Sequence, residues 1–336
     1  MTRRFHLVGA ALLAATLALA PLPVQAQWRL PLTCSVGSQN LFVRDVMTDL
    51  YFWYDHIPPV NPAAYQSPEA YLNAIRYLPL DARFSYIGAR AAEDAFYSES
   101  QYIGFGFGQW YVDGALRVVQ VFPDSPASEA GLARGDRFVS INGQSVDELA
   151  TLGLLGSAFG AAVEGVTVEG GYEGPTGERV AATMVKRIIT IPTVTTTQVY
   201  TLEDGRRVGY VFFRNFVQPS VAALDEAFAM LRDAQVNDLV LDVRYNGGGL
   251  VSVAQHLASL IGGKRTEGQL LAEYYHNDRN SFRNREIRFE EKANALTLDR
   301  LFVITTGSSA SASEVIVNAL RPFIPVVTVG STTYGK

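Results

Sequence analysis

Cysteine and histidine are both scarce in this chain of 336 residues. Its one cysteine is Cys34, so a disulfide framework within the chain is excluded. Three histidines remain after residue 26, at His56, His256 and His276, and none has a context typical of a catalytic histidine or a metal cluster. A Ser-His-Asp triad and a zinc site are therefore poorly supported, and the sequence indicates neither a metal nor an organic cofactor.

Lysine is the next scarce residue type. Only four of the 28 basic residues are lysines, at Lys186, Lys264, Lys292 and Lys336. The chain otherwise uses arginine, which keeps its proton and cannot act as a base. A lysine on a glycine turn, as at Lys336, is therefore weak evidence for a lysine that acts as a general base.

Long apolar runs are also rare. The one prominent run, Val8 to Ala20, follows two arginines and precedes Val24-Gln25-Ala26, so residues 1–26 have the features of a secretory signal peptide. The run is short for a membrane span, and no transmembrane segment is expected in the mature chain. We expect a periplasmic or secreted protein. Lipid anchoring at Cys34 is a weaker alternative, because the residues before it form a poor lipoprotein cleavage site.

The charge balance is acidic. The chain has 28 basic and 33 acidic residues, and loss of residues 1–26 would change its net charge from −5 to −7. An acidic surface repels phosphate backbones and anionic headgroups. Nucleic acid and anionic membranes are therefore not expected as partners.

Residues 308–336 are the most informative segment that is present. Ser308-Ser-Ala-Ser-Ala-Ser-Glu314 opens an apolar helix, and Lys336 follows 25 residues after Ser311 on a glycine turn. A serine at a helix start and a nearby lysine are the components of a Ser-Lys hydrolase. The spacing Ser311-x-x-Glu314 is also that of a capping box, so Ser311 has an ordinary structural explanation as well.

The surroundings of Ser311 predict how its hydroxyl is presented. Residues 301–304 form a short apolar strand, residues 305–309 a turn of small residues, and residues 315–320 an apolar helix that ends before Pro322. A strand, a tight turn and a helix start would place free N–H groups beside the serine. Those groups would stabilise a developing oxyanion.

From residue 206 onward strands and helices alternate. Strands are expected at 208–213 and 239–243, and helices at 220–231 and 250–261, with the run Asn246-Gly-Gly-Gly249 after the second strand. This βαβ alternation predicts a largely parallel sheet covered by helices. The glycine run is either a simple turn or a place where the backbone comes close to a substrate carbonyl.

The first two thirds of the chain contain two further regions. Residues 35–90 are aromatic-rich, with helices expected at 41–54 and 67–77. Residues 93–195 resemble a PDZ domain, on the strand and turn pattern of residues 118–146 and on the loop Ile103-Gly104-Phe105-Gly106. In such a loop, glycine-spaced N–H groups bind a terminal carboxylate, and the adjoining strand edge pairs with the peptide.

Several blocks together resemble the carboxyl-terminal processing peptidases, also called tail-specific proteases, which are serine peptidases with a Ser-Lys dyad and a PDZ domain. The family's Ser-Ala-Ser-Ala-Ser-Glu block aligns with residues 309–314, its Thr-Phe-Gly-Lys block with Thr-Tyr-Gly-Lys at 333–336, and its Asp-x-Arg-x-Asn-x-Gly-Gly segment with residues 242–249. The resemblance implies Ser311 as nucleophile and Lys336 as general base. It also implies an oxyanion hole from the N–H groups of Gly248 and Ala312, with Gly249 as the alternative to Gly248.

The resemblance implies a multidomain α+β protein. Its parts would be a signal peptide at 1–26, a helical N-terminal cap at 35–90, a PDZ domain at 93–195 and a protease core at 196–336. The core would be of the ClpP/crotonase type, with a mostly parallel sheet. The chain departs from the family at Pro322, where many members have an aspartate.

The expected function is that of an endopeptidase in the cell envelope that cleaves unfolded or tail-marked polypeptides, bound through their C-termini. Lys336 must be neutral to act as a base, so we expect it to be buried, with Tyr334 and the strand at 326–329 as its apolar wall. Because the family continues beyond this lysine, the 336-residue form is expected to be truncated and nearly inactive.

Two other functions are compatible with the sequence. A non-catalytic PDZ adaptor in the envelope would bind the C-termini of proteins without cleaving them. A hydrolase for small esters or thioesters is disfavoured, because a small ester has no tail for a PDZ domain to bind. The sequence does not indicate an oligomeric state.

Overall fold

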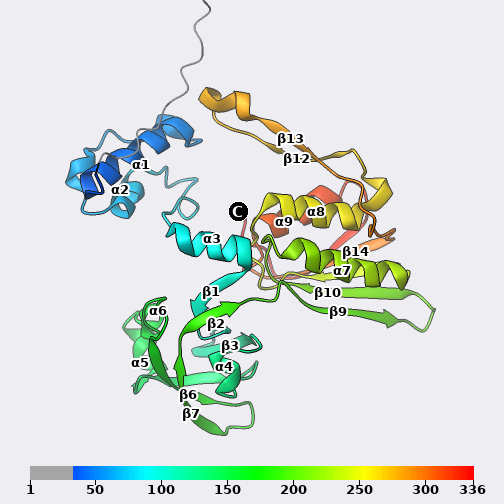
Figure 1. The fold of residues 1–336 in the computed structure, drawn as a ribbon, viewed down its shortest axis with the longest axis horizontal. Helices are drawn as coiled ribbons and strands as arrows, with labels where there is room; N and C mark the ends of the chain where they lie inside the picture. The colour runs from blue at the N-terminus through cyan, green and yellow to red at the C-terminus, as the bar shows by residue number, and fades with distance from the viewer. Residues whose placement is uncertain (1–32) are drawn as a thin grey trace, which may run out of the picture. The chain divides into compact units, whose positions relative to one another are not determined.

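The computed structural model describes residues 33–336, which form two compact units (Figure 1). One unit contains residues 33–85 together with Asn277–Asn280, and the other contains Tyr86–His276 and Ser281–Lys336. The predicted signal peptide at 1–26 lies outside the described residues. Among the helices of residues 33–336, none has the length and apolar character needed to cross a membrane.

The N-terminal unit is helical around an aromatic cluster. Its elements are α1 (Val36–Leu50), η1 (Tyr54–His56), η2 (Pro62–Ala64) and α2 (Pro68–Ile75). Ser67 caps α2 by accepting a hydrogen bond from Ala70 N–H, and Pro68 supplies the fixed backbone angle of the first turn. The core contains Tyr51 and Tyr71, both buried. The backbone of Tyr51 is extended, with φ −64° and ψ 134°, so the helix ends at Leu50 and not at residue 54 as predicted.

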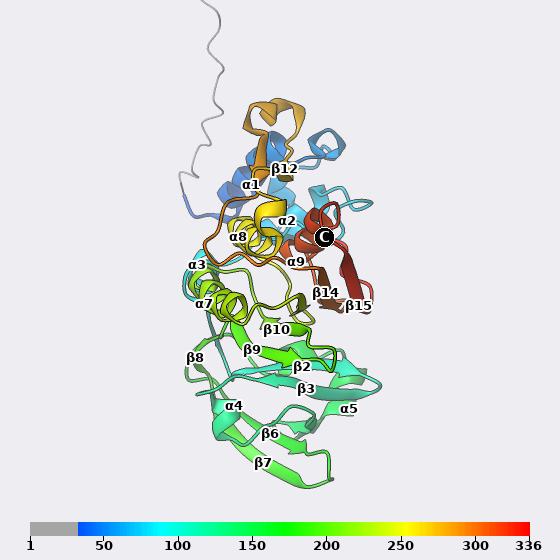
Figure 2. The same ribbon diagram turned by 90° about the vertical axis from the view of Figure 1, so that its right-hand side faces the viewer.

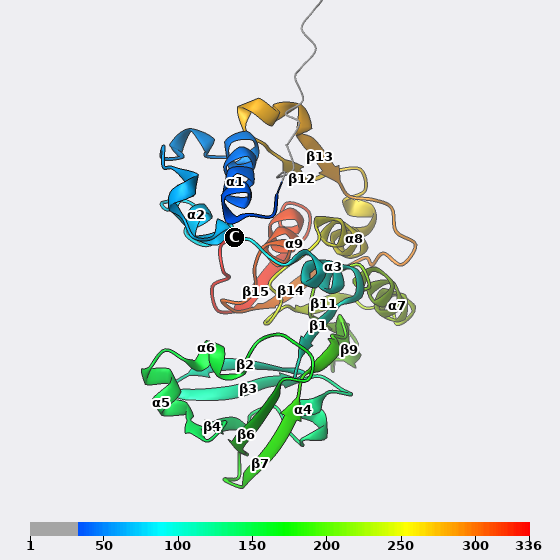
Figure 3. The same ribbon diagram turned by 60° about the vertical axis from the view of Figure 1, so that its left-hand side comes forward.

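The second unit begins with a small, mostly antiparallel domain (Figure 3). A sheet in the order β2-β3-β4-β6-β7, with β5 paired to β4, surrounds a core that includes Phe105, Phe138 and Tyr172. A separate two-stranded sheet pairs β1 with β8. The elements are α3 (Arg90–Glu99), β1 (Gln101–Gly104), β2 (Phe107–Val112), β3 (Ala115–Val121), α4 (Pro126–Glu129), β4 (Arg137–Ile141), β5 (Gln144–Ser145), α5 (Val146–Thr151), α6 (Leu155–Ala158), β6 (Thr167–Glu173), β7 (Arg179–Val185) and β8 (Arg187–Thr190).

The rest of the second unit is a five-stranded sheet with helices (Figure 2). The strand order is β15-β14-β11-β10-β9, in which β10, β11, β14 and β15 are parallel and β9 is antiparallel to β10. The elements are β9 (Val194–Thr201), β10 (Arg207–Phe213), α7 (Ser220–Asp233), β11 (Asp238–Asp242), α8 (Val251–Gly262), η3 (Gly263–Arg265), β12 (Leu270–Tyr274), β13 (Arg285–Arg288), β14 (Arg300–Thr305), α9 (Ala312–Leu320) and β15 (Val326–Gly330). Between β12 and β13, η4 (Asp278–Arg283) begins with residues of the N-terminal unit.

The core of this sheet follows from the sequence pattern. Strand β11 is apolar along its length, with Leu239 and Leu241 fully buried, as expected for a parallel strand covered on both faces. Phe228 of α7 and Leu257 of α8 belong to the same core cluster. The predicted multidomain α+β fold with a mostly parallel sheet is therefore confirmed, while the antiparallel edge strand β9 and the hairpin β12–β13 were not predicted.

Candidate active site

Three neighbouring parallel strands end at one edge of the sheet and bring the predicted catalytic segments to it. Strand β11 ends at Asp242, β14 at Thr305 and β15 at Gly330, with Thr305 opposite Gly330 in the register. The loops that follow carry the glycine run, Ser311 and Lys336. Loops at the carboxyl ends of parallel strands are where α/β sheets bind their ligands.

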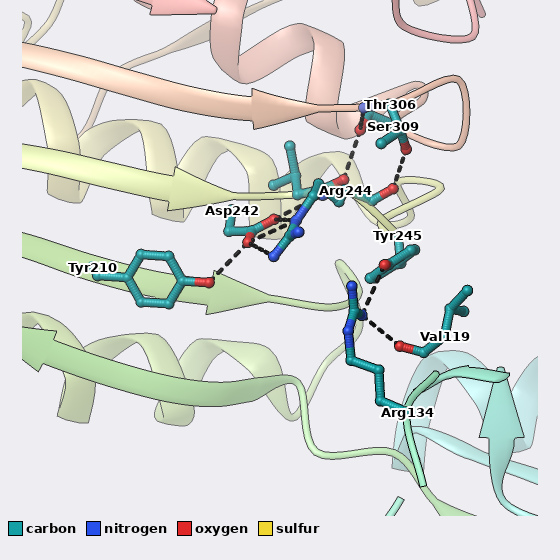
Figure 4. Close-up of polar contacts among 9 residues, drawn as sticks. Val119, Arg134, Tyr210, Asp242, Arg244, Tyr245, Thr306 and Ser309 are labelled. Atoms are coloured by element: carbon teal, nitrogen blue, oxygen red, sulfur yellow. Dashed lines mark hydrogen bonds and ion pairs between the residues drawn. The ribbon is translucent and has the colours of Figure 1, made fainter. Parts of the chain in front are cut away.

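The three alternating serines before and within α9 have different environments. Ser309 is buried and donates to Val243 O at 2.7 Å, and Ser313 is buried and donates to Asn246 O at 2.9 Å. Both therefore join the serine loop to the loop after β11, and Figure 4 shows Ser309 in that position. Ser311 lies between them at the N-cap of α9.

The backbone of Ser311 is strained. Its φ is 55° and its ψ is −115°, a conformation that residues with a side chain rarely adopt. Such strain costs about 1–3 kcal/mol and is concentrated at functional sites. Of the three serines, Ser311 is thus the one whose geometry suits a nucleophile.

Gly248 lies directly against Ser311. A Cβ atom on Gly248 would be 2.8 Å from Ser311 Cβ and 2.9 Å from Ala312 N, and the φ of Gly248 is +98°. Only glycine fits this position, because both the contact distance and the backbone angle exclude a side chain. The structure thus brings together Ser311, Gly248 and the first N–H of α9.

The N–H groups available for an oxyanion are not equivalent. Within residues 33–336 the Ala312 N–H has no hydrogen-bond partner, as expected at a helix start. The Gly248 N–H instead donates to Asn246 Oδ1 at 2.9 Å. A substrate carbonyl would have to compete with Asn246 for this donor, while the Gly249 N–H has no partner in the described part of the chain.

Asn246 holds the two loops together, a role that the sequence pattern did not assign. Its side chain is fully buried and donates through Nδ2 to Phe213 O at 3.1 Å, while its backbone O accepts from Ala310 N–H at 3.2 Å. The serine loop is therefore fixed relative to strand β10 through one buried amide. The only sequence signal was its place in the Asp-x-Arg-x-Asn segment.

An ion pair between buried Asp242 and half-buried Arg244 supports the loop after β11 (Figure 4). Asp242, which is fully buried, pairs with Arg244 at 2.7 Å and accepts from the Tyr210 hydroxyl at 2.8 Å. The hydrogen bonds to Asp242 raise the pKa of Arg244, and burial, together with the bond to Asp242, raises the pKa of Tyr210 to about 12. The Thr306 hydroxyl donates to Arg244 O, so the pair also fixes the serine loop.

Tyr245, next in the same loop, is contacted by two arginines. Arg134 donates to its hydroxyl at 2.9 Å and to Val119 O at 2.6 Å, as Figure 4 shows. Arg214 donates to Tyr245 O at 2.6 Å. The loop that carries the glycine run is therefore held from the antiparallel domain as well as from the sheet.

Lys336 is brought to the start of α9 through its backbone. The carboxylate of Glu314 accepts from the N–H groups of Ser311 at 2.7 Å, Gly335 at 2.8 Å and Lys336 at 3.0 Å. Tyr334 N–H donates to Ser309 O at 2.9 Å. The backbone of the Gly-Lys turn is thus anchored beside the serine loop.

The expected apolar wall around Lys336 is not formed by the residues that were predicted for it. Lys336 itself is exposed, and Val327 and Val329 of β15 are 42% and 50% exposed. Strand β15 is an edge strand, so one side of it has no neighbour among residues 33–336. That expectation was wrong for the described residues.

The predicted carboxylate-binding loop lies at the end of β1. Ile103 and Gly104 end the strand, Phe105 is buried, and Gly106 has a φ of +88° with Ser125 too close for a side chain. Beside this loop is a cavity of about 460 Å³ with a largely apolar lining that includes Tyr102, Ile103, Ile188 and the alanines of α3. An apolar side chain of a peptide would fit there.

Lys186 lies near the same loop and was not assigned a role. Its Nζ donates to Gly160 O at 2.8 Å and to Ala161 O at 2.7 Å, and lies 5.2 Å from the centre of the Phe105 ring. Burial lowers the pKa of this lysine. Within residues 33–336 no group of His, Cys, Asp and Glu side chains is placed to hold a metal.

Profiles of known families match three stretches of the chain. Peptidase family S41 matches residues 207–336, the peptidase S41 N-terminal domain matches residues 38–86, and a PDZ domain matches residues 117–157. The N-terminal helices, the antiparallel domain and the parallel sheet thus each correspond to a recognised part.

Two curated relatives carry the family's name. The chain is 29% identical over 243 residues to the carboxy-terminal processing protease CtpB of Bacillus subtilis (strain 168), covering 71% of this chain and 47% of that protein. It is 29% identical over 230 residues to the chloroplastic carboxyl-terminal-processing peptidase 3 of Arabidopsis thaliana, covering 66% of this chain and 43% of that protein. The chain therefore spans about half the length of these relatives.

Solved structures share the fold. A putative S41 protease from Bacteroides fragilis superposes with a TM-score of 0.67 at 26% identity, covering 87% of this chain and 78% of that one. A photosystem II D1 C-terminal processing protease has a TM-score of 0.51 at 23% identity, covering 90% of this chain and 83% of that one. These solved structures share the fold of the chain, and the profile matches show that residues 207–336 belong to peptidase family S41, in line with the curated relatives named carboxy-terminal processing proteases.

Proposed function

We propose that this protein is a serine endopeptidase in which Ser311 is the nucleophile and Lys336 the general base. The observation that carries the proposal is the strained backbone of Ser311 at the start of α9, against Gly248 and the free N–H of Ala312. A serine that only capped the helix would not need this conformation, because ordinary N-caps have extended backbone angles.

The chemistry follows from these positions. Neutral Lys336 Nζ takes the proton of Ser311 Oγ as the oxygen attacks the scissile carbonyl carbon, and the carbonyl oxygen becomes an oxyanion. Ala312 N–H stabilises this charge, together with Gly248 N–H released from Asn246 or with Gly249 N–H. Collapse of the intermediate expels the amine, which takes the proton from Lys336. Water then hydrolyses the acyl-enzyme by the same steps.

The substrates in this proposal are unfolded or tail-marked polypeptides. The PDZ domain would bind the C-terminal carboxylate at the loop Ile103-Gly104-Phe105-Gly106, with the neighbouring apolar cavity receiving a side chain. The signal features of residues 1–26 support action in the periplasm or outside the cell.

A non-catalytic adaptor is the second candidate, and one observation favours it. The Gly248 N–H is already bonded to Asn246 Oδ1 and is not free to bind an oxyanion. In this alternative the PDZ domain binds protein C-termini and Ser311 serves as a helix cap.

Proteolysis of an unfolded protein distinguishes the two. The full-length gene product should cleave it, and Ser311→Ala and Lys336→Ala should each lower the rate by at least about 100-fold, since nucleophile and base act as one unit. Ser308→Ala is the matched control, because Ser308 is an exposed serine of the same loop. Cleavage that survives Ser311→Ala would overturn the proposal, and absence of cleavage with retained tail binding would support the adaptor.

A further inference from the structure

One carboxylate oxygen links the residue of the nucleophile to the residue of the base. Glu314 Oε2 accepts from Ser311 N–H at 2.7 Å and from Lys336 N–H at 3.0 Å. The other oxygen, Oε1, accepts from Gly335 N–H at 2.8 Å. The two halves of the proposed dyad thus meet at a single atom, although they belong to different loops.

Glu314 is held as an anion at this place. Burial alone would raise its pKa, but the Thr333 hydroxyl and the N–H groups of Lys336, Gly335 and Ser311 donate to it, so the pKa is lowered below its usual value. Hydrogen bonds to an ionised carboxylate are shorter and about twice as strong as neutral ones. The carboxylate can therefore hold a turn that would otherwise be free to move.

Helix capping explains only part of this arrangement. A capping box requires Glu314 to bond the N–H of Ser311, which it does. The donors from Gly335 and Lys336 come from the segment after β15 and contribute nothing to the start of α9. The same side chain therefore also anchors the Gly-Lys turn.

We infer that Glu314 is a positioning residue that places Lys336 for proton transfer from Ser311, an inference that rests on the function proposed above. A general base acts only within hydrogen-bond reach of the proton that it takes, and a flexible turn would lose that geometry for most of the time. Glu314 touches neither substrate nor the transferred proton. Its effect on the reaction passes through Lys336.

A double-mutant cycle tests this dependence. The rate at which a fluorophosphonate probe labels Ser311 reports the reactivity of the hydroxyl without requiring a peptide at the PDZ domain. In the full-length gene product, Glu314→Gln should slow labelling by about 10-fold or more, because one acceptor oxygen is replaced by a donor that faces N–H groups. In the Lys336→Ala background the same substitution should change the rate by less than about 2-fold, since coupled residues are not additive.

Two controls accompany the cycle. Glu203→Gln changes an exposed glutamate of the β9–β10 turn and should leave labelling unchanged, while Ser311→Ala should abolish it. With a peptide substrate, Glu314→Gln should lower kcat and leave KM unchanged, since the peptide-binding loop is untouched. Thr333→Val removes the hydroxyl donor to Glu314 and should slow labelling by a smaller factor, again only when Lys336 is present. This variant replaces Glu314→Gln in the test if Glu314→Gln does not fold.

The outcomes separate the inference from the function on which it rests. If Glu314→Gln slows labelling by the same factor in the wild-type and Lys336→Ala backgrounds, Glu314 acts only as a helix cap and the inference is overturned. Unchanged labelling in Glu314→Gln would overturn it as well. If Lys336→Ala labels as fast as the wild type, the dyad itself fails. A loss that disappears in the Lys336→Ala background supports both.

Discussion

At Gly248 the absence of a side chain determines how closely two loops can approach. We expect Gly248→Ala to lower peptidase activity by about 100-fold or more, because the new methyl group would displace Ser311 and the nearby N–H groups by several tenths of an ångström. The positive φ should also cost about 1–2 kcal/mol of stability. Hydrolysis rates and urea unfolding of the purified variant measure the two effects.

Gly247 provides the matched control for this substitution. It lies one residue earlier, is exposed, and a Cβ atom there would have no neighbour within 4 Å. Gly247→Ala should therefore retain activity. If both alanines inactivate the protein equally, loss of backbone flexibility in the glycine run is responsible, and the contact with Ser311 is not.

Single residues also show what sequence reasoning can reach. Ser311 and Lys336 were suggested by their local sequence, and their roles, like that of Gly248, were implied by the resemblance of their segments to the motifs of a known family. The bond between Gly248 N–H and Asn246 could not be predicted, since it depends on loop geometry and not on residue type. The link from Glu314 to Lys336 was also missed, because Glu314 had a sufficient local explanation as a helix cap.

Between helices α7 and α8, a buried histidine makes the stability of the second unit depend on pH. His256 Nε2 lies 3.0 Å from Asp225 Oδ1, and its pKa is lowered chiefly by burial and also by Lys292, which together outweigh the opposite effects of Asp225 and Glu290. The folded state therefore binds this proton less readily than the unfolded state. The stability contributed by neutral His256 is present above its unfolded pKa of about 6.5 and is lost as pH falls.

Urea unfolding of the wild type and of His256→Gln at about pH 7.5 and about pH 5 measures this effect, given an unfolded histidine pKa near 6.5. The wild type should lose more stability between the two pH values than the variant, at about 1.4 kcal/mol for each unit by which the pKa is lowered. An equal loss in both proteins would show that other groups cause the acid sensitivity.

Among the elements, those with strong periodicity were predicted and those fixed by distant partners were not. The expected strands at 208–213 and 239–243 correspond to β10 and β11, and the expected helix at 250–261 corresponds to α8. The hairpin β12–β13 was missed because residues 270–288 are polar and alternate weakly. A strand's direction also depends on its neighbour, so the antiparallel pairing of β9 with β10 was not visible in the sequence.

For the whole molecule, the unusual feature is that the N-terminal unit contains four residues from far along the chain. Asn277 donates to Asp49 O at 2.8 Å and to Tyr51 O at 2.9 Å, and Asn280 donates to Asp49 O at 2.7 Å. Arg279 donates to Thr48 O at 2.7 Å. These side chains donate to carbonyl groups at and just after the C-terminal end of α1, where helical carbonyls need donors from elsewhere.

Asn277→Ala should therefore destabilise the N-terminal unit by about 1–3 kcal/mol, because it leaves Tyr51 O without its donor and removes one of the two donors to Asp49 O. Hydrogen exchange of the α1 amides should become faster, while exchange in the parallel sheet should be unchanged. Phe282→Ala is the matched control on the same hairpin, since Phe282 is 74% exposed. Unchanged protection of α1 in Asn277→Ala would show that solvent replaces the lost donors at no cost.

This arrangement has a consequence for how the protein is made. During synthesis α1 leaves the ribosome long before Asn277 does, and at roughly 5–20 residues per second the delay is on the order of 10–40 s. During that interval the nascent N-terminal segment has apolar side chains but lacks part of its native structure. The N-terminal unit can thus become complete only after most of the chain has been translated.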